Sequence, residues 1–101
     1  MGRKAVEKYC MVVPSFETLR NLGIAGLKII MVLREKRECS VNELIRNART
    51  GGRVLYRVLP VLRKYGLIEE KWVFDRRIIS LTKKGEKVAR VICKLVETIA
   101  E

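Results

Sequence analysis

Residues Ser40 to Glu69, SVNELIRNARTGGRVLYRVLPVLRKYGLIE, decide the fold, because they contain two amphipathic segments separated by a glycine-containing turn. Ser40 followed by Glu43 is the pattern of a capping box, in which each side chain accepts a hydrogen bond from the other residue's backbone N–H. We therefore expect a helix to begin at Val41. The apolar residues of this helix follow the i, i+3, i+4, i+7 spacing of a single buried face: Val41, Leu44, Ile45 and Ala48.

The second amphipathic segment predicts a helix that ends at Tyr65. Gly66 can adopt the left-handed conformation that closes a helix, and Leu67 can then fold back on Leu62 in a Schellman arrangement. Pro60 removes one intrahelical hydrogen bond and either kinks the helix or lies on an exposed face. Two short helices joined by such a turn make a helix-turn-helix. The expected buried stripe of the second helix consists of Leu55, Val58, Leu59 and Leu62.

The flanking segments complete an α+β fold that is mostly helical. Ile24 to about Lys36 is apolar on nearly every side until its last turn, which predicts a central core helix. β-Branched and aromatic runs before and after Asp75 predict a two-stranded hairpin with its tip near the sequence DRR. Thr82 is the expected N-cap of a last helix.

The chain is expected to have three parts. Residues 1–23 form an N-terminal extension that packs at a dimer interface, with a strand or helix at Ala5 to Val13 and a turn of helix from Ser15 to Leu22. Residues 24–81 form the domain with a three-helix core and a two-stranded β wing. Residues 82–101 form the C-terminal helix. A length of 101 residues is typical of one compact domain.

The charge of the chain indicates a polyanionic partner. It carries 22 Lys and Arg against 11 Asp and Glu, a formal net charge of +11. For one small domain this points first to nucleic acid. A merely soluble basic protein is the alternative, but the stretch from Ile45 to Ile68 contains no acid, whereas an ordinary surface mixes both signs.

Several other classes of protein are not expected. The longest apolar run, Ile29 to Leu33, is far shorter than the roughly 20 residues of a membrane span, and the N-terminus lacks the apolar centre of a signal peptide. A cytoplasmic protein without a membrane partner is therefore predicted. The chain has no His and no C-x-x-C pair, which argues against a metal site. The cysteines are interpreted as small buried apolar groups: Cys10, Cys39 and Cys93.

An enzyme is not expected either. The chain contains neither the glycine-rich loop of phosphate-binding enzymes nor the dinucleotide-binding motif. Glu69 and Glu70 are neighbours on a predicted strand and face opposite ways, so they cannot share one substrate. The sequence therefore predicts no catalytic residue and no cofactor.

The order of these elements, with these residues, resembles the winged helix-turn-helix transcriptional regulators, particularly the MarR-like and ArsR-like groups and their short archaeal relatives. The similarity covers roughly Ile24 to Val91. The stretch quoted first resembles the family's helix-turn-helix with its L-x-x-x-G-L-I junction, and DRRIISLTKKG resembles its wing signature, D-R-R followed by L-T-x-x-G. Where the family usually has Gly and Ser in the turn, this chain has Arg49 and Gly51, so the N-cap of the second helix is either Thr50 or Gly51.

The resemblance implies a sequence-specific, double-stranded DNA-binding transcriptional regulator, with a recognition helix from about Gly52 to Tyr65 in the major groove and the wing at the minor groove. The residues implied for base contacts are Arg53, Tyr56 and Arg57. Those implied for the DNA backbone or the same basic face are Arg46, Asn47, Arg49, Thr50 and Lys64. In the wing, Arg76 and Arg77 are implied for the minor groove, with Asp75 pairing with one of them.

Other interpretations of the same residues stay open. The arginines can be a solvated charged face, and the protein can be an architectural DNA binder or a winged-helix module that binds RNA or protein. Trp72 and Phe74 share one face of the predicted strand, and they are interpreted as core or interface residues rather than a platform for stacked bases.

The last helix has a wider apolar stripe than packing on one small domain requires. A symmetric homodimer through this helix is predicted, with two recognition helices about one DNA turn, ~34 Å, apart. Packing within the chain is the alternative. The predicted dimerisation residues are Val88, Ile92, Leu95, Val96 and Ile99.

Overall fold

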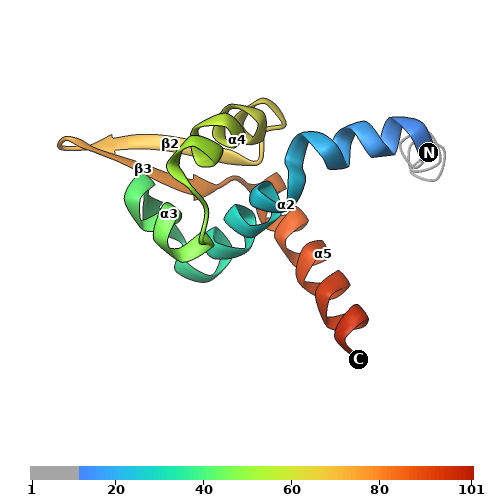
Figure 1. The fold of residues 1–101 in the computed structure, drawn as a ribbon. Coiled ribbons are helices and arrows are strands. Elements are labelled where there is room, and N and C mark those ends of the chain that lie inside the picture. The colour runs from blue at the N-terminus through green and yellow to red at the C-terminus, as the bar shows by residue number, and fades with distance from the viewer. Residues whose placement is uncertain (1–11) are drawn as a thin grey trace.

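The structure, a computed structural model, describes residues 12–101. The elements of this part are α2 (Val12–Lys36), β1 (Glu38–Ser40), α3 (Val41–Ala48), α4 (Gly52–Lys64), β2 (Ile68–Val73), β3 (Arg76–Leu81) and α5 (Lys83–Ala100). Figure 1 shows the β2–β3 hairpin projecting from one side of the helical body, while α5 and the N-terminal part of α2 project from the other. The α+β, mostly helical prediction is confirmed.

The sheet differs from the prediction in one respect. It has three antiparallel strands in the order β1-β3-β2 rather than two, because β1 pairs with β3. Cys39 lies opposite Ile79 in this pairing, and both side chains are buried. The third strand therefore anchors the base of the wing to the body.

Helix α2 contains the predicted core helix in its second part. Gly23 has φ 61° and ψ 177°, which lies outside the helical region, so the helix breaks there. Glycine tolerates this positive φ because it has no Cβ. After the break, Ile29, Ile30 and Leu33 are completely buried.

The N-terminal part of α2 begins at Val12, so the turn of helix predicted from Ser15 to Leu22 belongs to a longer helix. The element predicted at Ala5 to Val13 lies almost entirely outside the described residues, as does Cys10.

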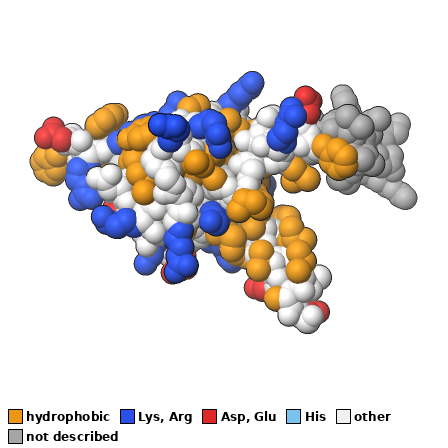
Figure 2. Space-filling view, in the orientation of Figure 1, with side chains coloured by type: hydrophobic (Ala, Val, Ile, Leu, Met, Phe, Trp, Pro, Cys, Tyr) orange, Lys and Arg blue, Asp and Glu red, His pale blue; other side chains and the backbone are white. Residues whose placement is uncertain are grey.

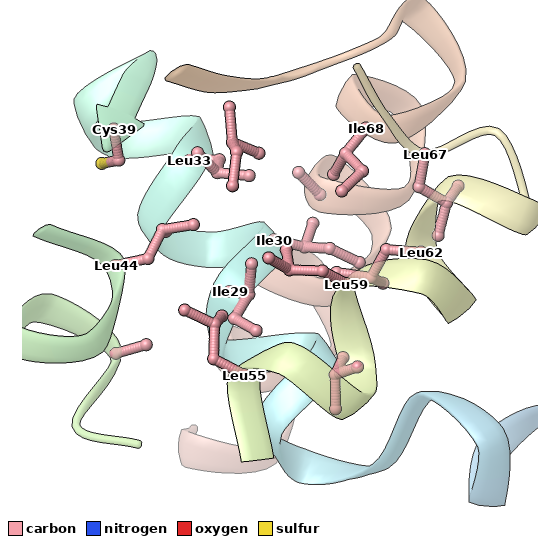
Figure 3. Packing of buried hydrophobic residues seen from close by; sticks show 14 of the residues in the cluster. Ile29, Ile30, Leu33, Cys39, Leu44, Leu55, Leu59, Leu62, Leu67 and Ile68 are labelled. Atoms are coloured by element: carbon pink, nitrogen blue, oxygen red, sulfur yellow. The ribbon is translucent and has the colours of Figure 1, made fainter. Parts of the chain in front are cut away.

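The core lies between α2, α3, α4, the first half of α5 and the sheet (Figure 3). Leu44 of α3 and Ile79 of β3 contribute fully buried side chains. Because the core takes up the whole apolar face of α4, the opposite face of that helix is left for solvent or a partner. The buried residues of α4 are the four predicted ones, Leu55, Val58, Leu59 and Leu62.

The predicted Schellman arrangement closes α4. Gly66 has φ 72°, its N–H donates to the Arg63 carbonyl at 2.9 Å, and the Leu67 N–H donates to the Leu62 carbonyl at 3.0 Å. These bonds satisfy carbonyl groups that the end of a helix leaves free. The chain is thereby turned directly into β2.

The L-T-x-x-G sequence fastens α5 to this junction. Thr82 caps α5, since its Oγ1 accepts from the Gly85 N–H at 3.0 Å, and the same hydroxyl donates to the Gly66 carbonyl at 2.5 Å. A Cβ on Gly85 would clash with the Leu67 carbonyl oxygen. The motif is therefore explained by close packing between α5 and the end of α4.

Candidate nucleic-acid interface

Helix α3 is held at its start by the predicted capping box. The Ser40 N–H donates to Glu43 Oε1 at 3.0 Å, and the Glu43 N–H donates to Ser40 Oγ at 3.3 Å. The bond from the Ser40 N–H, and after it the Ser40 hydroxyl, hold the pKa of the Glu43 carboxyl below its usual range. The outer face of the helix exposes Arg46 and Asn47. One amide hydrogen of Asn47 is used within the helix, in a 2.8 Å bond to the Glu43 carbonyl.

The turn between α3 and α4 contains two predicted phosphate contacts, Arg49 and Thr50, and only Arg49 is exposed. Arg49 adopts a left-handed conformation (φ 55°, ψ 48°) and is exposed. Thr50 turns inward: its N–H donates to the Ile45 carbonyl at 3.2 Å, and its Oγ1 is buried without a hydrogen-bond partner among the described residues. The Thr50 hydroxyl is therefore not presented to a phosphate as expected. Gly51 is the N-cap of α4 and makes no side-chain cap.

The outward face of α4 is basic, as predicted. Pro60 is exposed on this face. This agrees with the interpretation that the proline is tolerated on an exposed face. Figure 2 shows Lys and Arg side chains over the helix-turn-helix, whereas the visible side of α5 is mostly apolar. The predicted DNA-contacting residues of this helix are all exposed: Arg53, Tyr56, Arg57 and Lys64.

The wing ends in a turn at Phe74 and Asp75. Arg76 pairs with Val73 and Arg77 with Trp72 in the β2–β3 ladder. The two arginines therefore lie within strand β3 rather than at the tip, which corrects the predicted position of the turn.

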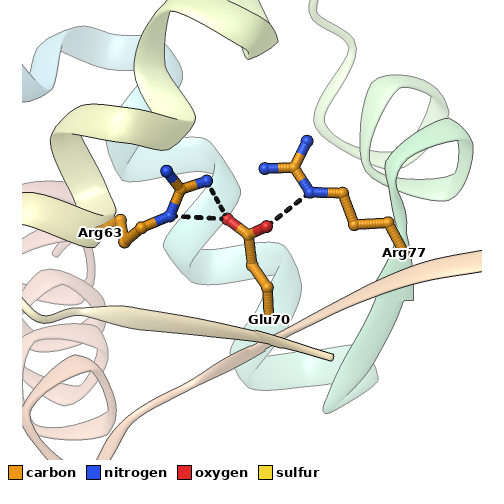
Figure 4. Close-up of polar contacts among 3 residues, drawn as sticks. All are labelled: Arg63, Glu70 and Arg77. Atoms are coloured by element: carbon orange, nitrogen blue, oxygen red, sulfur yellow. Dashed lines mark hydrogen bonds and ion pairs between the residues drawn. The ribbon is translucent and has the colours of Figure 1, made fainter. Parts of the chain in front are cut away.

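Glu70 ties the wing to α4. Arg77 Nε donates to Glu70 Oε2 at 2.5 Å, and Arg63 of α4 donates to Glu70 Oε1 through Nε at 2.9 Å and through Nη2 (Figure 4). The bond from Arg77, and then that from Arg63, hold the pKa of Glu70 below its usual range, although partial burial opposes this. Glu70 in turn raises the pKa of Arg77. The wing and the basic helix are thereby held side by side.

Arg76 is the more open of the two wing arginines. Its Nη2 lies 3.6 Å from Glu43 Oε1, and its side chain is 65% exposed, against 24% for Arg77. The ion pair predicted for Asp75 is wrong, because Arg76 and Arg77 pair with Glu43 and Glu70 instead.

The aromatic residues of the wing are not part of the core. Trp72 is 69% exposed and Phe74 is 96% exposed. Trp72 shares the face of β2 that carries the buried Ile68, but the strand runs beyond the helices that cover Ile68. The interpretation of Trp72 and Phe74 as core residues is therefore wrong. The alternative, that they belong to an interface with a partner, stays a prediction.

The predicted apolar stripe of helix α5 is buried in its first half and exposed in its second half. Ile92 is buried and Val88 packs against the core, so packing within the chain accounts for the first half. The second half is exposed in this single chain: Leu95, Val96 and Ile99. Phe16 and Leu19, on the projecting part of α2, are exposed as well.

Cys39 and Cys93 do not belong to the basic face. Cys39 is buried, and burial is the main cause that raises the pKa of its thiol; Cys93 is half-buried. Within residues 12–101, no three His, Cys, Asp or Glu side chains come together where they could hold a metal ion. No helix in that range combines the length and apolarity needed to cross a membrane.

Comparison by sequence finds neither a matching protein-family model nor a matching curated protein. Comparison by structure finds a MarR family transcriptional regulator from Silicibacter pomeroyi, with a TM-score of 0.71 and 23% identity over 76% of this chain and 53% of that one. The chain has a MarR-like winged helix-turn-helix fold. It spans about half the length of the Silicibacter protein.

A second neighbour is a DNA-binding protein from Sulfolobus solfataricus, with a TM-score of 0.63 and 22% identity over 73% of this chain and 80% of that one. NadR, solved in complex with 4-hydroxyphenylacetate, gives a TM-score of 0.72 and 22% identity over 84% of this chain and 66% of that one. At these identities the likeness establishes the fold.

Proposed function

We propose that this protein is a cytoplasmic, sequence-specific regulator of transcription that binds double-stranded DNA and has no catalytic activity. The observation that carries the proposal is the division of α4 into two faces. One face is buried in the core, and the other exposes Arg53, Tyr56 and Arg57 beside the wing. A helix presented in this way fits the major groove.

Each basic residue has a proposed role. Arg53 and Arg57 bond to guanine edges, since an arginine can bond bidentately to guanine O6 and N7, and Tyr56 contacts base edges or phosphate. Arg76 reaches the minor groove, whereas Arg77 acts mainly through its bond to Glu70. The residues proposed to contact phosphates are Arg46, Asn47, Arg49 and Lys64.

We further propose a homodimer. The proposed interface is the exposed second half of α5, with Leu95, Val96 and Ile99 as its central residues. Phe16 and Leu19, on the projecting N-terminal part of α2, extend it. A two-fold axis through this interface is proposed to set two half-sites about 34 Å apart.

The experiment is a selection of duplex DNA from a random pool, followed by affinity measurements on the selected and random duplexes across a salt series. Arg53→Ala and Arg57→Ala should each cost about 1–3 kcal/mol on the selected duplex and little on the random one. Arg46→Ala is the matched control: it should weaken both duplexes alike and reduce the salt slope by about 1.

Two other outcomes would replace the proposal. Equal binding to every duplex, with equal losses from all three variants, would indicate an architectural DNA binder. Tighter binding to single-stranded RNA than to any duplex would indicate an RNA-binding winged-helix module.

A further inference from the structure

The tip of the wing is apolar, although the hairpin that carries it is charged. Trp72, Val73 and Phe74 are 69%, 42% and 96% exposed. They lie at the end of the hairpin, away from the buried base at Ile68 and Ile79. Figure 2 shows this end of the molecule as a cluster of apolar atoms beside an acidic group. The cluster has no counterpart in the chain to pack against within residues 12–101.

The backbone of the tip adds a second observation. Phe74 has φ 58°, a left-handed conformation that a side chain with Cβ adopts only at a cost of roughly 1–2 kcal/mol. Tight hairpin turns normally place Gly, Asn or Asp at such positions. Backbone strain of this kind is retained where the surrounding structure or the function requires it. No buried contact requires it here, since Phe74 is almost fully exposed.

We propose that the wing tip is an apolar wedge, in which Phe74, supported by Trp72 and Val73, enters the minor groove of duplex DNA and partly unstacks one base step. Apolar side chains inserted in this way kink a duplex by about 20–90° toward the major groove. The proposal rests on the duplex binding proposed above, and it adds that the protein bends the duplex it binds.

The size of the patch favours DNA over a protein partner. A fully buried aromatic side chain contributes about 150–250 Å², so the two aromatic side chains of the tip bury at most about 500 Å², below the roughly 800 Å² per partner of a stable protein interface. Trp72 and Val73 are already partly covered, which lowers the area that a protein partner could gain. A minor groove about 6 Å wide is too narrow for both strands of a hairpin with their side chains, because the strand backbones alone lie about 4.8 Å apart, but it admits the single side chain of a turn.

The charges behind the tip also favour a polyanion. Lys71 and Arg76 flank it with side chains that are 57% and 65% exposed. Glu38 and Glu43 are their partners, at 2.9 Å and 3.6 Å. Both pairs are exposed, so phosphates can compete for the two cations at little cost. Asp75 is the one acid within the turn, and we expect it to weaken the approach to phosphates.

The experiment uses the full chain and the duplex selected for it, labelled at both ends to report bending by energy transfer. Phe74→Gly removes the wedge and suits the left-handed backbone, so the hairpin should keep its fold. Phe74→Leu keeps an apolar wedge and is the matched control. Trp72 is the single tryptophan of the chain and reports whether the tip becomes buried in the complex.

We expect the wild type and Phe74→Leu to bend the duplex and Phe74→Gly to bend it much less. Placing a flexible TA step at the wing site should improve wild-type affinity about tenfold and leave Phe74→Gly affinity nearly unchanged. Quenching of Trp72 fluorescence by acrylamide should fall when the duplex is added. Asp75→Asn should tighten binding severalfold without changing the bend.

Two results overturn the wedge. If the duplex binds but stays straight, or if Phe74→Gly bends it as the wild type does, the wedge is wrong and the proposed regulator stands. If no duplex binds at low salt, both the wedge and the proposed function are wrong.

Discussion

The helix-turn-helix body buries its apolar side chains, whereas the projecting parts of the molecule expose theirs. In the body, Leu55 and Leu59 are completely buried, whereas Leu95 on α5 and Phe74 on the wing are more than half exposed. Burial of apolar area is the main favourable term in folding. The body therefore contributes most of the free energy of unfolding. The projecting parts carry apolar surfaces that become buried only when a partner binds.

The sharpest test of this difference compares two leucines. Leu55→Ala should reduce the free energy of unfolding by about 2–5 kcal/mol, because it leaves a cavity in the core. Leu95→Ala should cost less than about 0.5 kcal/mol at low protein concentration, where the chain is a monomer. Urea unfolding followed by circular dichroism measures both.

In the proposed homodimer, the loss from Leu95→Ala should grow as the protein concentration rises, since association stabilises the folded state by mass action. Equal losses from the two leucines at every concentration would contradict the division between body and projection.

Two glycines test how tightly α5 is fastened to the body. Gly85→Ala should cost about 1–3 kcal/mol or more, because the added Cβ clashes with the Leu67 carbonyl oxygen. Gly26→Ala is the matched control: its Cβ meets neighbours at 3.4–3.7 Å, within ordinary contact, and alanine favours the helix by roughly 0.5–1 kcal/mol. Thermal unfolding should therefore move in opposite directions for the two variants. An unchanged or higher melting temperature for Gly85→Ala would show that the junction tolerates a larger separation.

The capping box offers a smaller effect within the body. Ser40→Ala should cost about 1 kcal/mol, because the Glu43 N–H loses its acceptor. Ser40→Thr keeps the hydroxyl and should retain most of the stability. Urea unfolding of the two variants measures the difference, and equal losses would mean that the cap contributes nothing.

The smallest effect is expected where the body meets the wing. The pKa of Glu70 is lower in the folded state than its ordinary value of 4.5. Its contribution is therefore fully present above that pH and is lost as the pH falls through the folded value. Glu70→Gln should cost less than about 1 kcal/mol at pH 7, because both arginine partners are partly exposed.

The wild type should consequently lose more stability between pH 6 and pH 3 than Glu70→Gln does, as measured by urea unfolding at several pH values. Glu69→Gln, on the exposed opposite face of the strand, is the control and should follow the wild type. A parallel loss in all three proteins would mean that the ion pairs contribute nothing to folding.

Local sequence patterns predicted much of the body. The capping box, the stripe of α4 and the Schellman closure at Gly66 all depend on residues within about seven positions of one another, and all three are confirmed. The core helix was predicted to start at Ile24, and the helix breaks at the preceding residue, Gly23.

Features that depend on distant pairing were missed or misplaced. Strand β1 has three residues, too few to show an alternating pattern, and it exists because β3 pairs with it. The register of the hairpin decides that Arg77 lies within reach of Glu70 rather than Asp75. Strand parity grouped Trp72 with Phe74 as core or interface residues, but β2 ends at Val73, Phe74 lies in the turn, and both side chains are exposed.

The most direct test of the proposed DNA-binding function is amide chemical-shift mapping by NMR during titration with the selected duplex. We expect the largest changes at the α3–α4 turn, at Arg53 to Arg57 on α4 and at Trp72 to Arg76 on the wing, with small changes beyond Ile92 on α5. Changes concentrated on the far half of α5, with α4 and the wing unaffected, would contradict the proposal that these two elements bind DNA.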